Sequence, residues 1–147
     1  MSLFSSLSVS ASGMNAQRTR AELLVENLAN AETTRTPDGG PYRRKDVVFQ
    51  SDTVNAPFSS VLSDAMEGGG STGVSVSNVI VDQRDPEQRY MPGHPDADAN
   101  GYVAFPRMNP AEEMVDLVSA SRGFQANVAS MSSVKEMLQR SIDLLKS

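Results

Sequence analysis

The stretch GHPDADANGY, at residues 93 to 102, holds the oxygen-bearing side chains that a calcium site needs. Asp96, Asp98 and Asn100 stand at alternate positions before a glycine, which is how a calcium-binding loop of the EF-hand type begins. The twelfth residue counted from Asp96 should then be a bidentate Glu, but here it is Arg107, a cation that opposes the ion. We therefore expect a sharp acidic turn, and the alternative function is that of a calcium-binding or other helical protein-interaction module.

Catalytic chemistry has few candidate residues in this sequence. The single histidine, His94, stands in the same proline-rich stretch, and neither a Ser-His-Asp set nor an acid/base pair of carboxylates is visible. The chain has no cysteine, which excludes a thiol nucleophile, a disulfide and a cysteine-based zinc site. We expect a protein that is not an enzyme and that uses no metal or cofactor.

The composition fits one domain with a core of moderate size. The 147 residues are 39% hydrophobic and 21% charged, but only 5% are aromatic, so Leu, Val, Met and Ala must build the core. The net charge is −5, and the only basic cluster, Arg43 to Lys45, is expected to be a solvated strand end, so we expect no nucleic-acid partner. The sequence lacks both the pattern of a secretory signal and an apolar run of membrane-spanning length, so we expect a soluble chain that is not exported by the general secretory route and does not insert into a membrane.

The first part of the chain has the apolar spacing of a long amphipathic helix. Apolar residues recur in alternating steps of three and four, with a polar interruption at Arg18, as in the contact stripe of a coiled coil. This first stripe contains Phe4, Leu7, Ala11, Met14, Ala21, Val25 and Leu28. We assign residues 1–34 to the N-terminal helix of a helical domain, because Pro37 and the glycines that follow it end the pattern.

The last part of the chain repeats this spacing over more than four heptads. The second stripe contains Met114, Leu117, Phe124, Val128, Met131, Leu138, Ile142 and Leu145. Ser121 and Lys135 are its polar interruptions. Asn109 can cap a helix and Pro110 suits its first turn, so we predict a helix from about 110 to 146 within a C-terminal segment, 109–147, of the same helical domain.

Residues 35–108 lack the helical period and predict a β-rich middle region. Strands are expected at 42–49, 74–81 and 101–106. Between the first two strands, Phe58 and Leu62 lie one turn apart in a possible short helix, and a glycine-rich loop follows at 67–73. The predicted fold class is α+β, with long N- and C-terminal helices that pair as a coiled-coil-like helical domain and a small β-rich middle region.

Both apolar stripes need a surface that covers them, because burying one large apolar side chain contributes roughly 1.5–3 kcal/mol. In one interpretation, the terminal helices form an ordinary hairpin and cover each other within one subunit. In the other, they become fully ordered only when subunits stack and bury one another's stripes. The pattern leaves both interpretations open, and any single stripe residue can belong to either contact.

Four stretches of the chain resemble the flagellar basal-body rod proteins. They are SASGMNAQRTRAELLVENLANAETT at 10–34, GGPYRRKDVVF at 39–49, GHPDADANGYVAFP at 93–106 and EEMVDLVSASRGFQANV at 112–128. Many relatives have Tyr and Glu where this chain has Phe124 and Gln125, and alanine where it has Gly123. Since glycine inside a helix costs about 1 kcal/mol relative to alanine, we expect Gly123 either to admit a close neighbouring helix or to allow a local bend.

The resemblance implies a structural subunit of the proximal rod, the hollow drive shaft that spans the periplasm and transmits torque. In that family the terminal helices form an inner domain that lines the export channel, and the β-rich middle faces outward. The implied partners are other rod subunits, proximal and distal, the junction protein between the MS ring and the export gate, and the flagellar type III export apparatus. The implied location is the flagellar basal body, reached without a cleaved signal peptide.

The resemblance also suggests roles for residues outside the two stripes. The spacing of Phe58 and Leu62 is similar to an export-gate motif of early flagellar substrates, although an ordinary contact one helical turn apart is the favoured explanation. Polar residues beside the stripes are candidates for lateral contacts between subunits, because charged and amide groups fix register, with a solvated face as the alternative. These candidates are Gln17, Arg18, Arg20, Asn27, Arg122, Gln125 and Asn127.

Overall fold

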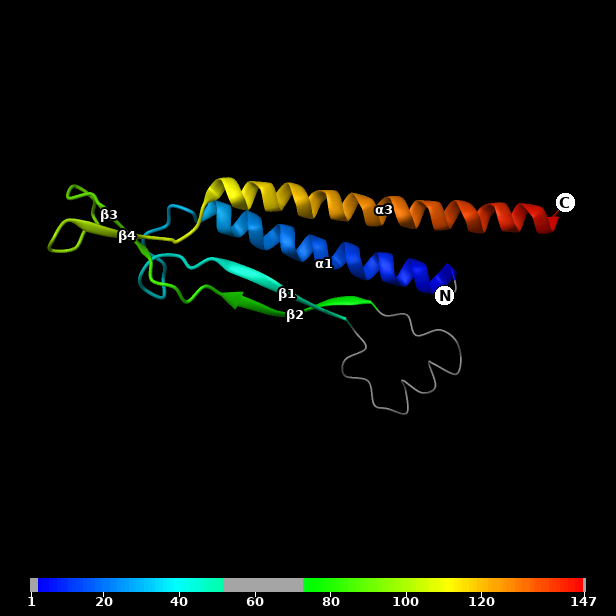
Figure 1. Ribbon diagram of the computed structural model, residues 1–147, viewed down its shortest axis with the longest axis horizontal. Coiled ribbons are helices and arrows are strands. Elements are labelled where there is room, and N and C mark those ends of the chain that lie inside the picture. Colours follow the sequence, from blue (N-terminus) through cyan, green and yellow to red (C-terminus); the bar gives the residue numbers. More distant parts are fainter. Residues whose placement is uncertain (1–2, 52–72, 147) are drawn as a thin grey trace, which may run out of the picture.

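The computed structural model describes residues 3–51 and 73–146, with the side chains of residues 5–51 and 73–144. In this part of the chain, two long helices run side by side in opposite directions (Figure 1). They are α1, Leu3–Ala29, and α3, Pro110–Lys146. The proposed helix with Phe58 and Leu62, and residues 67–72 of the glycine-rich loop, lie outside the described residues.

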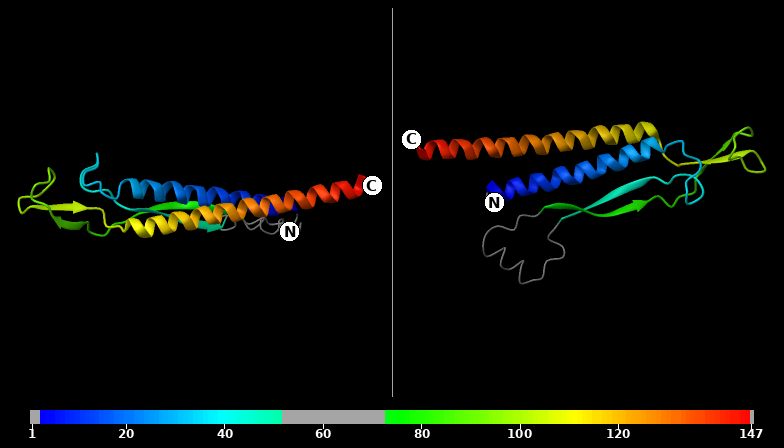
Figure 2. Two further views of the ribbon diagram at one scale, coloured as in Figure 1. Left: turned by 90° about the horizontal axis from the view of Figure 1, so that it is seen from above. Right: turned by 180° about the vertical axis from the view of Figure 1, so that it is seen from behind.

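A first β-hairpin packs along α1 on the side away from α3 (Figures 1 and 2). Its strands are β1, Lys45–Ser51, and β2, Val74–Val81, which pair antiparallel from Lys45 opposite Val81 to Ser51 opposite Val74. The register shifts after Val48, so one residue of β2 is left over as a bulge beside Asn78. This bulge explains why the alternation of apolar residues in 74–81 breaks at Asn78.

A second, smaller hairpin projects beyond the ends of the two helices (Figure 1). It consists of β3, Glu87–Tyr90, and β4, Tyr102–Phe105, joined by the acidic turn. Val103 of β4 is fully buried and Phe105 is buried beneath the Arg89 guanidinium, whereas Tyr90 and Tyr102 are exposed and meet edge to face. These contacts form a very small core that stabilises the second hairpin.

The architecture confirms the predicted α+β fold class. The helix expected from 110 to 146 and the strand expected from 74 to 81 begin and end at those residues. The strand β3 was not predicted, because EQRY is exposed at all four positions and has no apolar alternation. No helix in the described part of the chain is both long enough and apolar enough to span a bilayer.

Small residues bring α1 and α3 close together. Ala16 and Ala120 are almost fully buried, Ala120 with 1% of its surface exposed. A Cβ atom added at Gly13 would lie 3.0 Å from Nδ2 of Asn127, and one added at Gly123 would lie 3.2 Å from Cδ of Gln17. The close approach of a neighbouring helix is therefore the reason for glycine at position 123.

The helix pair has a regular register, which the same contacts define. Gly13 faces Asn127, Gln17 faces Gly123, and Asn27 bonds to Glu113, so each step along α1 is matched by a step back along α3. Helix α3 has 37 residues and α1 has 27, and the C-terminal end of α3 extends past the start of α1 (Figure 1).

Candidate functional site

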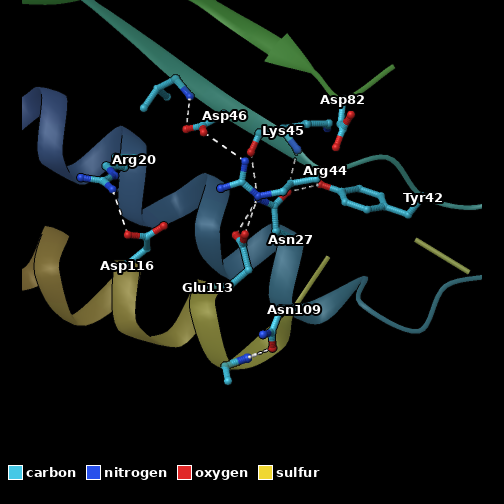
Figure 3. A network of polar contacts seen from close by, with 12 residues as sticks. Arg20, Asn27, Tyr42, Arg44, Lys45, Asp46, Asp82, Asn109, Glu113 and Asp116 are labelled. Carbon is cyan, nitrogen blue, oxygen red and sulfur yellow. Dashed lines mark hydrogen bonds and ion pairs between the residues drawn. The ribbon is translucent and has the colours of Figure 1, made fainter. Parts of the chain in front are cut away.

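A buried polar cluster joins the two helices to the first hairpin, and we call it the polar junction (Figure 3). Its centre is Asn27, which is 0% exposed. The Asn27 Nδ2 group donates to the Lys45 carbonyl at 2.8 Å and to Oε2 of Glu113 at 2.9 Å. Its Oδ1 accepts from the Lys45 N–H at 2.9 Å and from the Tyr42 hydroxyl at 3.0 Å. All four hydrogen-bonding positions of the amide are therefore used.

Glu113 is the second centre of the polar junction. It lies in the first turn of α3, where a negative charge interacts favourably with the helix dipole, and Asn109 caps that turn by accepting from the Ala111 N–H at 3.1 Å. The buried Glu113 carboxylate also accepts from Nε of Arg44, which bonds to Asp46 as well. Burial alone would lower the pKa of Arg44, but hydrogen bonds and charge from Glu113 and Asp46 raise it overall. Glu113 is thus a paired buried charge.

Part of the basic cluster at 43–45 belongs to this junction, which differs from the solvated strand end expected from the sequence. Arg43 is exposed, as expected. Arg44 is partly buried against Glu113, and the Lys45 ammonium pairs with Glu26 of α1. The carboxylates of α1 and α3 therefore fix the start of β1 against both helices.

Tyr42 provides a test of the polar junction. Burial raises its pKa to about 12, and the nearby charges of Glu26 and Glu113 act in the same direction. The pKa of a tyrosine in an unfolded chain is about 10. The contribution of the protonated Tyr42 hydroxyl to the free energy of unfolding is therefore complete below that pH and is lost as the pH rises towards 12. We expect Tyr42→Phe to lower the free energy of unfolding by about 1 kcal/mol at neutral pH, through loss of the bond to Asn27.

The measurement is urea unfolding of both proteins from neutral pH to about pH 11, which lies inside the range from about 10 to 12 over which the Tyr42 contribution falls. The difference in unfolding free energy between wild type and Tyr42→Phe should shrink over the alkaline range. Tyr90→Phe is the control, because Tyr90 is exposed in the second hairpin. A constant difference at every pH would mean that the Tyr42 hydroxyl does not titrate as a buried group.

The acidic turn uses its oxygens within the chain. Oδ1 of Asp98 accepts from the N–H groups of Asn100 and Tyr102, both at 2.8 Å, and Gly101 adopts a φ of 82° that favours glycine. Asp96 accepts from the Thr34 hydroxyl at 2.8 Å and so holds the segment that follows α1 to the turn. Within residues 3–51 and 73–146, His, Asp and Glu do not gather in groups of three that could hold a metal. The geometry is that of a hairpin turn.

The structure divides the seven candidate lateral residues into two groups. Gln17, Arg20, Asn27 and Asn127 lie at the contact between α1 and α3 within the subunit, with Arg20 in an ion pair to Asp116. Arg18, Arg122 and Gln125 are exposed. The Gln17 Oε1 atom is buried without a hydrogen-bond partner, so the contact between the helices is not fully satisfied there.

The contact between α1 and α3 lies one helical position away from the predicted stripes. On α1 it passes through Ser10, Gly13, Gln17, Arg20, Leu24 and Asn27. On α3 the most buried positions are Glu113, Ala120 and Val134, each directly before a predicted stripe position. Side-chain burial is not described for Phe4 and Leu145, so the structure does not place those two stripe residues.

The larger apolar residues of the predicted stripes therefore lie beside the internal contact. Half-buried members are Leu7, Ala11, Met14, Ala21, Leu28, Leu117, Met131 and Leu138. Exposed members are Val25, Met114, Phe124, Val128 and Ile142, with Val25 51% exposed and Val128 40% exposed. In an antiparallel helix pair, the residue that follows each contact residue points to the same side of the pair on both helices. The stripe residues of α1 and α3 therefore share a face.

A groove between the helices marks this face. Its lining is Gln17, Arg18, Ala21, Leu117, Ala120, Ser121 and Phe124. Val25 lies one turn after Ala21 and Val128 lies one turn after Phe124, so both extend the same surface along the helices. We call the groove together with Val25 and Val128 the flank face. A continuous apolar surface of this kind is typical of a contact with another protein.

Comparison with known proteins agrees with the geometry. The profile of the family described as "Flagellar basal body rod FlgEFG protein C-terminal" matches residues 99–144, which include β4 and nearly all of α3. The chain is 44% identical to the flagellar basal-body rod protein FlgC of Bacillus subtilis, with 99% of this chain and 100% of that protein covered. It is 40% identical to the FlgC proteins of Borreliella burgdorferi and Salmonella typhimurium, with 98% or more of each chain covered.

A long antiparallel helix pair with an apolar flank, and relatives that match over nearly the whole length, define a structural protein of the flagellar basal-body rod. Such a protein is not an enzyme, and the calcium alternative is not favoured. Within the rod proteins, the chain belongs to the FlgC family. Membership places it in the flagellar basal body, where it assembles with other components.

Proposed function

We propose that this subunit polymerises through its terminal helices into the proximal part of the rod. The observation that carries the proposal is the flank face, where Val25, Phe124 and Val128 are exposed although the helices are already paired within the subunit. Apolar surface of this extent is a liability in an isolated protein and is stabilising when a neighbour buries it. Each terminal helix then has two contact surfaces. One side packs against the partner helix within the subunit, and the neighbouring side packs against another subunit.

The proposed division of labour follows the positions of the elements. The helical segments 1–34 and 109–147 form the inner part, which lines the export channel, and residues 35–108 form the outer part. The polar junction supports this division, because it fixes β1 to the start of α3 and so links the two parts rigidly. A rigid link is what a shaft that transmits torque requires.

The proposed partners follow from membership of the family. They are other proximal and distal rod subunits, the junction protein between the MS ring and the export gate, and the type III export apparatus that delivers the subunit into the periplasm without a cleaved signal peptide. The exposed side chains of Arg18, Arg122 and Gln125 are the candidates for lateral contacts. Phe58 and Leu62, which lie outside the described residues, remain the proposed export-gate motif.

The test is a deletion of the gene that encodes this chain. We expect basal bodies with rings but without a complete rod or hook, no secreted hook protein, and cells that do not swim. Electron microscopy of isolated basal bodies, a swimming assay and an immunoblot for secreted hook protein measure these results, and reintroduction of the gene is the control. Intact rods and hooks in the deletion strain would contradict the proposal.

A further inference from the structure

One edge of the second hairpin is blocked by the chain itself. The backbone N–H of Tyr102 in β4 donates to Oδ1 of Asp98 at 2.8 Å, and the Tyr102 carbonyl accepts from the Asp98 N–H, also at 2.8 Å. Both backbone groups of Tyr102 therefore point away from β3. The acidic turn uses them, so another strand cannot pair with β4 at this position.

The other edge of the hairpin, along β3, is open. Residues of an antiparallel pair alternate between those that bond across to the partner strand and those that point outward. The Met91 N–H bonds across to the Gly101 carbonyl at 2.9 Å. Tyr90, the partner of the outward-pointing Tyr102, must therefore point outward as well, and so must Gln88 two positions earlier. Within residues 3–51 and 73–146, no segment bonds to the outward backbone groups of Gln88 and Tyr90.

These backbone groups match those of an extended chain. Gln88 and Tyr90 offer two N–H groups and two carbonyls, about 7 Å apart along the strand, which is the repeat of a β-ladder. All four residues of β3 are exposed, and neither a proline nor a bulge interrupts the strand. An edge of this kind is a template for a further strand, with the affinity supplied by main-chain hydrogen bonds.

The residues around the edge disfavour a second copy of β3 as the added strand. Pro86 and Pro92 flank the strand and have no N–H group. Among antiparallel arrangements of two copies, the one that keeps every hydrogen bond therefore sets Gln88 of each copy opposite Tyr90 of the other. That register places the two Arg89 residues directly opposite each other, and like charges destabilise a cross-strand pair. The charges thus favour a different protein as the occupant.

The side chains at the edge select an apolar residue on the added strand. Tyr90 is 65% exposed and Tyr102 is 44% exposed, and their rings meet edge to face with centroids 5.4 Å apart. A strand beside β3 places one side chain next to Tyr90 on the same face of the sheet. Exposed tyrosines are typical of protein interfaces, where they bury a large apolar area. We expect an apolar or aromatic residue at this position of the partner.

A positively charged pocket lies at the base of the same hairpin. Its lining includes four arginines and one carboxylate, which are Arg43, Arg44, Arg84, Arg107 and Asp82. Arg44 and Arg84 are already paired with carboxylates of this chain. Arg43 and Arg107 are exposed, and neither has a carboxylate partner within the described residues. Pro86, which directly precedes β3, lines the same pocket, so a strand that continues past the start of β3 reaches these two arginines.

We propose that the open edge of β3 binds an extended segment of a different basal-body protein, which adds a third strand and places a carboxylate near Arg43 and Arg107. The inference rests on the proposed function, because it names a contact of the assembled subunit. The contact uses the second hairpin and not the terminal helices. Since this hairpin projects beyond the helices, its edge stays accessible when neighbours cover them (Figure 1).

Photocrosslinking combined with a proline substitution tests the strand pairing. The photoreactive amino acid p-benzoylphenylalanine replaces Tyr90 in the chain expressed in the deletion strain, and cells are irradiated before basal bodies are isolated. We expect an adduct with a different basal-body protein, which mass spectrometry maps to one segment of that protein. Gln88→Pro removes an outward N–H without removing a bond to β4, so it should reduce the adduct at least about tenfold. Gln88→Ala is the matched control, because it keeps the N–H, and its adduct yield should stay within about twofold.

A second pair of variants tests the carboxylate. Arg107→Glu reverses the charge in the pocket and should reduce the adduct at least about threefold, whereas Arg107→Lys keeps the charge and should retain most of it. An equal yield from both variants would show that the partner places no carboxylate there.

The folding of the variants is checked separately. Purified Gln88→Pro should unfold at the same urea concentration as wild type, because prolines are tolerated where the N–H of an edge strand faces water. If Gln88→Pro is unfolded, Tyr90→Pro removes the other outward N–H, and the photoreactive residue moves to Tyr102.

Other results would overturn the inference. An adduct with another copy of this chain would exclude a different protein as the occupant. An adduct that persists in folded Gln88→Pro would mean a contact through side chains without strand pairing, and the absence of any adduct from swimming cells would mean that the edge stays in water. If the chain is missing from the basal-body fraction, the proposed function fails and the inference fails with it, whereas its presence without the adduct removes the β3 contact alone.

Discussion

Asn27→Asp is expected to lower the free energy of unfolding by about 3–5 kcal/mol at neutral pH, the largest stability effect of any single change in the polar junction. The substitution keeps the size of the side chain but replaces Nδ2, which donates to the Lys45 carbonyl and to Glu113, with an oxygen. Two buried carboxylates would then lie at hydrogen-bonding distance with no proton between them. Urea unfolding of the purified chain measures the change.

The pH dependence distinguishes this mechanism from a simple loss of packing. The repulsion raises the pKa of one carboxyl in the folded variant above its unfolded value, so the loss of stability is complete at neutral pH and shrinks as the pH falls towards about 4. Asn15→Asp is the matched control, because Asn15 is exposed on the same helix, and it should change the unfolding free energy by less than about 0.5 kcal/mol. Equal effects of the two substitutions would show that Asn27 is not the centre of the junction.

The ends of α3 and β2 could be predicted because local rules decide them, whereas α1 ends at Ala29, before the end of the segment 1–34 that was assigned to it. The Asn109 cap, the proline after it and the sustained spacing of apolar residues define α3, and β-branched alternation defines β2. The strand β3 could not be predicted, because its four residues are exposed and it forms only through pairing with β4. Its partner β4 could be predicted, because the buried Val103 and Phe105 alternate along that strand.

The sequence could not predict which face of each helix forms the internal contact, and the reason is physical. A stripe drawn from hydropathy follows the largest apolar side chains, such as Met114 and Val128. The internal contact instead uses the small residues Gly123 and Ala120, which allow the backbones to approach. Hydropathy gives such small residues little weight, so the stripes predicted from it lie beside the internal contact.

The polar junction could not be predicted from the sequence pattern either. Asn27 was a candidate lateral residue, but Tyr42 and Glu113 were not identified as its partners, and Arg44 was expected to be solvated. The hydrogen bond from Asn27 to Glu113 spans 86 positions, so only the antiparallel register of the helices brings the two residues together. The usable signal was indirect: the stretches NLANAETT and GGPYRRK that carry the family resemblance each contribute side chains to the junction.

Val128→Asp is expected to abolish swimming and rod assembly while leaving the isolated subunit folded. Val128 belongs to the flank face and is 40% exposed, so an aspartate there stays in water in the isolated chain. The unfolding free energy should therefore change by no more than about 1 kcal/mol, as is usual for an exposed helix position. In the rod, the same carboxylate would be buried without a partner, which costs several kcal/mol for every subunit and blocks the contact.

Ala126→Asp is the matched control for the assembly defect. Ala126 is exposed two residues before Val128, so it lies on the opposite side of α3 and adds the same charge away from the flank face. Swimming assays and electron microscopy of basal bodies from a deletion strain that expresses each variant measure assembly, and urea unfolding measures the subunit. Normal rods built from Val128→Asp would mean that the flank face stays in water in the rod. A Val128→Asp chain that is unfolded in isolation would instead mean that Val128 belongs to the internal contact between α1 and α3.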